Sequence, residues 1–128
     1  MALVHDVGEA IVGDITPHCG VSEEDKYTRE NEAVAHIQSL APSTNWKELW
    51  DEYEDGKTDE ARVVKQLDKF DMIAQADEYE SKYGLDLSQF FSSTTKAFSS
   101  EPFLTWDRDL RERRERRLTS GGDKQATR

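Results

Sequence analysis

The stretch HDVGEAIVGDITP, residues 5–17, decides how the fold of this chain is interpreted. Small and apolar residues fill most positions from Leu3 to Val12, which predicts a helix, and residues 13–17 then form a loop. Because this helix is apolar nearly all round, we expect it to be buried on every side. No capping residue precedes Leu3, so we expect that an upstream part of the fold is missing from this chain.

Four side chains that can bind metal or transfer protons lie within this stretch, namely His5, Asp6, Glu9 and Asp14. An ionised Asp in a buried segment costs free energy unless it is paired or binds a metal. Glu9 follows His5 by four residues and therefore shares its helix face. One imidazole and three carboxylates suit a hard cation with a general acid or base beside it. The spacing fits equally well a hydrogen-bonded core histidine, with Asp6 as a cap or ion-pair partner.

A second pair of carboxylates occurs in VVKQLDKFDM, residues 63–72, where Asp68 and Asp71 stand three positions apart in a long helical pattern. A helix rich in Lys and Asp is more often a solvated face than a binding site. Taken alone, this segment therefore favours a surface helix.

The rest of the chain predicts further helices. Capping residues indicate helix starts after Ser22, Asn45 and Thr58, and breakers indicate helix ends at Pro42, Gly56 and Gly84. Apolar spacing after Phe90 predicts another helix, and Ser99 or Ser100, followed by Pro102, opens the last one. No stretch alternates with a period of two, so the predicted class is all-α.

The composition limits the location and the partners. The chain has 128 residues and a formal net charge of −10, whereas nucleic-acid-binding proteins normally carry a basic surface, so we expect no nucleic-acid partner. No run approaches the ~18 apolar residues of a membrane span, so no membrane partner is expected either. The single cysteine, Cys19, excludes an internal disulfide and fits a reducing compartment, the cytoplasm or the nucleus.

Taken together, His5-Asp6-x-x-Glu9, the Gly13-Asp14-Ile15-x-Pro17 loop and the later Lys65-Gln66-Leu67-Asp68 resemble the HD-domain metal-dependent phosphohydrolases, in particular their 5′-deoxynucleotidase branch. The segments 49–54 and 75–80 fit the same branch, and the resemblance covers roughly residues 2–105. It implies an HD-domain helical bundle over residues 1–105 that lacks its first helices. A charged helix over 106–118 and a disordered tail over 119–128 are expected to follow.

The resemblance also implies a role for each site residue. His5 and Asp6 would be adjacent metal ligands, and Asp68 the distant ligand. Glu9 would position or deprotonate the attacking water, and Asp14 would contact the sugar near its 3′-hydroxyl. The implied cofactor is a divalent cation (Mn, Co or Mg), the implied substrate is a deoxynucleoside 5′-monophosphate, and a homodimer is allowed.

The sequence also departs from the family pattern. That pattern begins with an upstream helix that carries another metal-binding His, together with an Arg and an aromatic residue that hold the nucleotide. His18 and His36 are poor substitutes, and we expect both at the surface. The resemblance therefore implies little activity for this chain alone, and a non-catalytic remnant is one alternative. Another is an HD phosphohydrolase that acts on a different phosphoester.

Two further groups have structural interpretations. Trp46, Trp50 and Tyr53 are expected in the core rather than in a base-stacking platform. The charged segment 107–117 places Asp107 and Asp109 four residues before arginines, which predicts a salt-bridged, solvated helix rather than a phosphate site.

Overall fold

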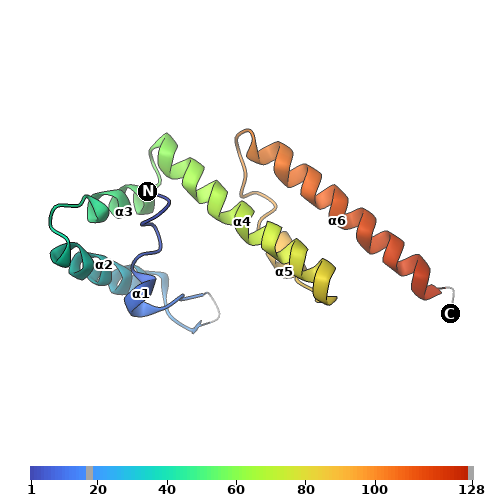
Figure 1. Cartoon of the computed structure of the whole chain (residues 1–128), viewed down its shortest axis with the longest axis horizontal. Coiled ribbons are helices and arrows are strands. Elements are labelled where there is room, and N and C mark those ends of the chain that lie inside the picture. Colours follow the sequence, from blue (N-terminus) through green and yellow to red (C-terminus); the bar gives the residue numbers. More distant parts are fainter. Residues whose placement is uncertain (17–18, 127–128) are drawn as a thin grey trace. The chain divides into compact units, whose positions relative to one another are not determined.

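The computed structural model of the protein describes residues 1–16 and 19–126, with side chains to residue 121, so the expectations for Pro17 and His18 lie outside the described residues. The described residues form six α-helices and no strand (Figure 1), which confirms the all-α class. The helices are α1 (Glu9–Val12), α2 (Glu23–Leu40), α3 (Trp46–Asp55), α4 (Asp59–Tyr83), α5 (Ser88–Ser92) and α6 (Phe103–Ala126). None of these helices is long and apolar enough to cross a membrane.

The chain divides into two compact units, residues 1–65 and 66–128, and α4 contains residues of both. In the first unit α2 contacts both α1 and α3. Its buried apolar residues are Val4, Ile15, Ala33, Val34, Trp50 and Ala61. Trp50 is therefore a core residue, as predicted, whereas Trp46 and Tyr53 are half-buried. Gly8 is buried against α2, where an added Cβ would lie 3.2 Å from Val34 Cγ2.

The segment before α1 differs from the expected helix over Leu3 to Val12. Only residues 9–12 are α-helical, and turns occupy most of the earlier positions. Leu3 is 98% exposed, so burial on every side is also wrong. Several of the turn hydrogen bonds join residues three apart, such as Val7 N–H to the Val4 carbonyl. Val4, Val7 and Gly8 have low helix propensities, which makes a regular α-helix less stable in this segment.

The helix ends mostly follow local capping chemistry. The Ser22 hydroxyl accepts a hydrogen bond from the Asp25 N–H at 3.1 Å, and Thr58 does the same for Ala61 at 3.2 Å. Gly56 ends α3 with a φ of 65°, a left-handed conformation that favours glycine. Asn45 is the exception, because its side chain makes no capping bond. The Lys47 N–H instead donates to the Gln38 side chain from α2 at 2.9 Å.

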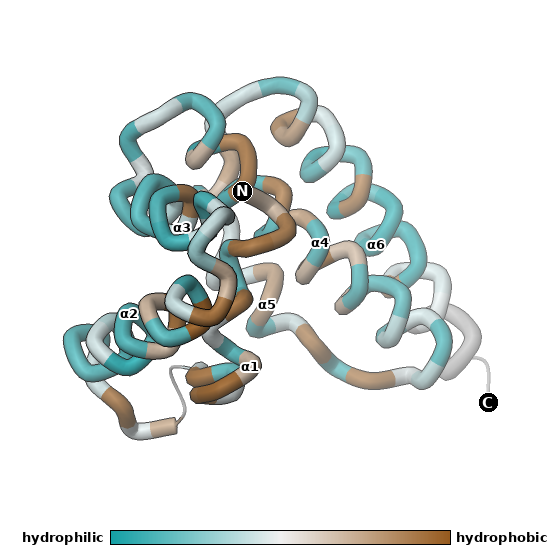
Figure 2. Tube along the Cα trace, turned by 60° about the vertical axis from the view of Figure 1, so that its left-hand side comes forward, coloured by the Kyte–Doolittle hydropathy of each residue, from teal (hydrophilic) through white to brown (hydrophobic). Residues whose placement is uncertain are grey.

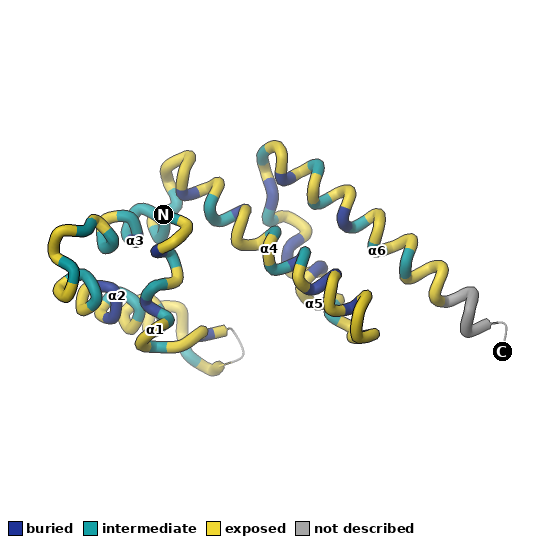
Figure 3. Tube along the Cα trace, viewed as in Figure 1, coloured by how far each residue is buried: buried dark blue, intermediate teal, exposed yellow. Residues whose placement is uncertain are grey.

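The second unit is built from the rest of α4 with α5 and α6, and Figure 3 marks buried positions on all three helices. Its core consists of Ile73, Ala76, Phe91, Phe98, Phe103 and Leu110. The buried Gln66 side chain accepts from the N–H groups of Ser99 and Ser100 at 2.8 and 3.2 Å. These bonds fix the chain just before α6 begins.

Helix α6 is mostly hydrophilic along its length (Figure 2), yet the prediction of a solvated, internally paired helix is wrong in part. The expected Arg111–Asp107 pair is present at 2.7 Å. Arg114 instead binds the buried carboxylate of Glu80 on α4 through two hydrogen bonds, of 2.7 and 3.1 Å. Arg117 contacts both Glu80 and the buried Asp77. The helix also continues to residue 126, beyond the expected end at 118.

We predict that Glu80→Gln lowers the free energy of unfolding by about 3 kcal/mol, because it leaves the partly buried Arg114, whose side chain is 16% exposed, without its carboxylate partner. The Glu80 side chain is only 4% exposed, and the Arg114 hydrogen bonds lower its pKa. Its contribution is therefore present at neutral pH and is lost as the pH falls through that lowered pKa.

Urea unfolding followed by circular dichroism measures this loss. The matched control is Asp109→Asn, which removes an exposed pair with Arg108 on α6 and is expected to cost at most about 1 kcal/mol. Equal losses for the two variants would contradict the role given to Glu80.

Candidate metal centre

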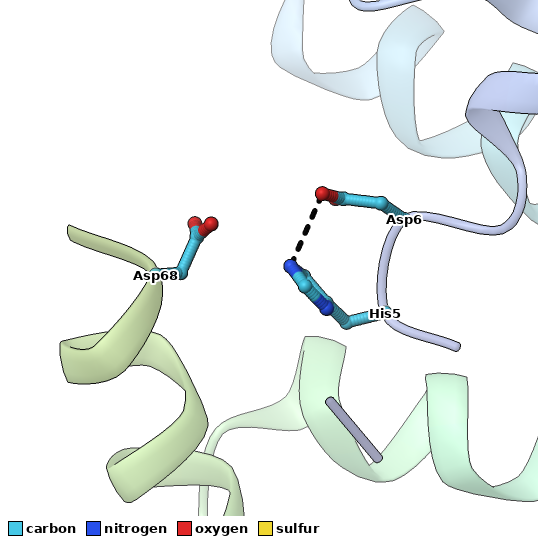
Figure 4. Close-up of side chains that lie close together, drawn as sticks. All are labelled: His5, Asp6 and Asp68. Carbon is cyan, nitrogen blue, oxygen red and sulfur yellow. Dashed lines mark ion pairs between the residues drawn. The ribbon is translucent and has the colours of Figure 1, made fainter. Parts of the chain in front are cut away.

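His5 and Asp6 form a close pair at the start of the chain. The Nε2 atom of His5 lies 3.1 Å from Oδ2 of Asp6, shown by the dashed line in Figure 4. The His5 side chain is 16% exposed and that of Asp6 is 57% exposed, so Asp6 does not carry the burial cost expected of it. The other ring nitrogen, Nδ1, lies 2.6 Å from the Ala2 carbonyl oxygen.

These contacts define the hydrogen-bonding state of the ring. A carbonyl oxygen can only accept, so Nδ1 of His5 must donate, and in the neutral ring Nε2 carries a lone pair. Nε2 then faces a carboxylate oxygen that also carries lone pairs. Two acceptors at this distance require a shared positive charge, from either a proton or a metal cation. Adjacent ligands of an octahedral cation with bonds of about 2.1 Å lie about 3.0 Å apart, so the spacing fits a metal.

Asp68 lies on α4 and is exposed. Its carboxylate oxygen and ligand atoms of His5 and Asp6 all lie within 4.8 Å of one another (Figure 4). The group does not include Asp71, three residues later. One imidazole nitrogen and two carboxylate oxygens are hard or borderline donors, which suit Mg, Mn, Co or Zn.

Glu9 begins α1 and is half-buried. Burial raises the pKa of its carboxyl, and the nearby charges of Asp6, Asp14 and Glu30 raise it further. A carboxyl with a raised pKa is a better proton acceptor at neutral pH than an ordinary Glu. Asp14 follows Gly13, whose φ of 77° ends α1, and is exposed.

Two carboxylates near this group, Glu30 on α2 and Glu54 on α3, received no role from the sequence. Burial is the main cause that raises the pKa of each, and the charge of Asp6 adds to it in both. Lys26 opposes the effect at both residues, and Lys65 also opposes it at Glu54. The sequence did contain one indication that Glu30 is partly buried. It lies on the apolar stripe of its helix, three residues before the buried Ala33.

His36 lies exposed on α2, as predicted. It lines a surface hollow with Ile11, Val12, Arg29, Glu32 and Ala33. It is not a member of the group formed by His5, Asp6 and Asp68.

Known proteins are similar in sequence to this chain. The family model described as HD domain matches residues 1–104. The chain is 43% identical to the 5′-deoxynucleotidase HDDC2 of Danio rerio over a 129-residue alignment, which covers 97% of this chain and 64% of that protein. It is 52% identical over 99 residues to the 5′-deoxynucleotidase hdd1 of Schizosaccharomyces pombe, an alignment that covers 70% of this chain and 50% of that protein.

The human 5′-deoxynucleotidase HDDC2 is 47% identical over 105 residues, which cover 77% of this chain and 51% of that protein. The chain therefore spans from half to just under two thirds of the length of these curated relatives.

We predict that Glu54→Gln stabilises the protein at pH 7 but not at pH 4. The folded state raises the pKa of Glu54, chiefly through burial, so it holds the proton more tightly than the unfolded chain does. Stability therefore falls as the pH rises through that raised pKa. Glutamine resembles the protonated acid and lacks this loss.

Thermal unfolding of both proteins at the two pH values measures the effect. Glu48→Gln, which removes an exposed carboxylate from the same helix, controls for the change in net charge. A gain of equal size at pH 4 and pH 7 would show that the ionised carboxylate is not its source.

Proposed function

Because the chain belongs to the HD domain family, we propose that it acts as a metal-dependent phosphohydrolase on deoxynucleoside 5′-monophosphates, with deoxynucleoside and phosphate as products. The observation that carries the proposal is the approach of the His5, Asp6 and Asp68 ligand atoms to within 4.8 Å. The names of the relatives, 5′-deoxynucleotidases in three organisms, support the choice of substrate.

His5 through Nε2, with Asp6 and Asp68 through carboxylate oxygens, would hold the divalent cation. The hydrogen bond from Nδ1 of His5 to the Ala2 carbonyl supports this assignment, because it leaves the Nε2 lone pair for the metal. A bound cation supplies positive charge for the phosphate oxygens and makes a nearby water more acidic.

Glu9 would accept a proton from the attacking water. The water oxygen forms a bond to phosphorus while the bond from phosphorus to the 5′-oxygen breaks, and the departing 5′-oxygen takes up a proton. The raised pKa of Glu9 supports this role, because a base works best with a pKa near the working pH. Asp14 would accept a hydrogen bond from the sugar 3′-hydroxyl and help to favour the deoxy form.

We predict divalent-cation-dependent phosphate release from deoxynucleoside 5′-monophosphates, faster than from the matching ribonucleotides. Phosphate release is followed with and without added divalent cation, at a high enzyme concentration and over a long time course. Equal rates on the paired substrates, or activity that survives strong chelation, would contradict the proposal. Metal binding with no turnover of any phosphoester would instead favour the non-catalytic alternative.

We also predict that Asp68→Ala weakens Mn²⁺ or Co²⁺ binding by more than about 100-fold, because even outer-shell partners contribute 10- to 100-fold to metal affinity. Asp71→Ala is the matched control on the same helix and should leave the Kd within a few-fold. Calorimetric titration of both variants measures the difference. Similar losses would mean that the ligand has been assigned to the wrong carboxylate.

A further inference from the structure

Tyr53, on α3, contacts the proposed metal ligand His5. Their ring centroids are 5.0 Å apart, with the ring planes inclined by 58°. This distance is typical of a favourable aromatic pair. Tyr53 also lies beneath the ammonium of Lys65, whose Nζ is 5.0 Å from the centre of the phenol ring. Neither the motif nor the mechanism proposed above gives this tyrosine a role.

We propose that Tyr53 is a positioning residue that holds the His5 imidazole in its metal-binding orientation. The inference rests on the metal site proposed above. Its physical content is that Tyr53 restricts the rotation of the His5 ring, so that Nε2 is directed toward Asp6 before any metal arrives.

The segment that carries His5 is irregular and only partly buried. Residues 1–8 are not a regular α-helix, and within them only Val4 and Gly8 are buried. The Nδ1 atom of His5 donates to the carbonyl of Ala2, itself exposed and next to the 98% exposed Leu3. The ring contact from Tyr53 on α3 adds to this hydrogen bond and restricts rotation of the imidazole about it.

Tyr53 itself is held firmly enough to serve this purpose. It lies three residues after Trp50, which is 1% exposed and anchors α3 in the core. The ammonium of Lys65 adds a cation–π contact on the ring. Gly56 leaves space for the Lys65 ammonium, because a Cβ at position 56 would lie only 3.3 Å from Lys65 Nζ.

The contacts of Tyr53 also reach the helix that carries the third ligand. Lys65 precedes Asp68 by three residues on α4, so the two are neighbours on one helix surface. Tyr53 therefore contacts His5 directly and the start of α4 through Lys65. A residue in this position affects metal binding without being a ligand.

The test is Co²⁺ binding by the full chain, measured by calorimetry and by the visible absorption of the bound ion. Tyr53→Leu should weaken Co²⁺ binding at least tenfold and change the absorption spectrum, because the imidazole is no longer held in place. Tyr53→Phe keeps the ring and should retain the affinity within about threefold and the spectrum of the parent protein. Trp46→Leu is the control for loss of a half-buried aromatic residue on α3, and should leave the spectrum unchanged.

Equal Co²⁺ affinity and identical spectra for the parent protein and Tyr53→Leu would overturn the inference while leaving the metal site intact. Absence of Co²⁺ binding by the parent protein would overturn the proposed metal site itself. If Tyr53→Leu does not unfold cooperatively, Tyr53→Met, whose longer and more flexible side chain fills more of the space, takes its place with the same expected result. Loss of cooperative unfolding in both variants would show that the residue is merely structural, and would also overturn the inference.

Discussion

A neutral imidazole nitrogen and a carboxylate oxygen both present lone pairs, so the 3.1 Å approach of His5 Nε2 to Asp6 requires positive charge between them. Because Nδ1 donates its hydrogen bond to the Ala2 carbonyl, Nε2 is the ring nitrogen that faces the carboxylate. Neighbouring acids add to the negative charge around this pair, and Glu9, Glu30 and Glu54 all have raised pKa values. Lys26 and Lys65 offset the negative charge only in part. The surroundings of His5 and Asp6 therefore carry negative charge that a divalent cation would reduce.

In residues 66–128, buried carboxylates are neutralised by arginines of the same chain. Asp77 and Glu80 are buried on α4, and arginines of α6 bind both of them. The pKa of Glu80 is lowered as a result, in contrast to the raised values in the first unit. Arg114 also stands 4.1 Å from the ring centre of Phe91, so its charged group is held on two sides. Here the compensating charge is part of the chain, because the arginines of α6 bind the carboxylates of α4.

The sequence predicted those features that depend on neighbouring residues. The local sequence pattern is sufficient to predict contacts between residues a few positions apart. Examples are the caps at Ser22 and Thr58 and the end of α3 at Gly56. Features that depend on tertiary contacts were missed. The Lys47 N–H is capped by Gln38 from another helix, and the arginines of α6 bind acids more than thirty residues away. The regular helix expected over residues 3–8 is likewise absent, because apolar composition does not by itself provide neighbours to pack against.

In the candidate site, too, the sequence predicted the local features and missed those that depend on tertiary contacts. The motif is local, so His5, Asp6 and Glu9 could be named from spacing, but Asp68 and Asp71 could not be separated that way. Residues three apart on a helix lie on nearly the same face, so either could have been the ligand. The resemblance proposes Asp68 as the ligand, and its grouping with His5 and Asp6 supports that proposal. Glu30 and Glu54 were missed for a related reason, since a carboxylate acquires a raised pKa from burial and from charges brought in by other helices. Those same raised values imply that a metal binds in competition with protons, which links the electrostatics of the first unit to its proposed chemistry.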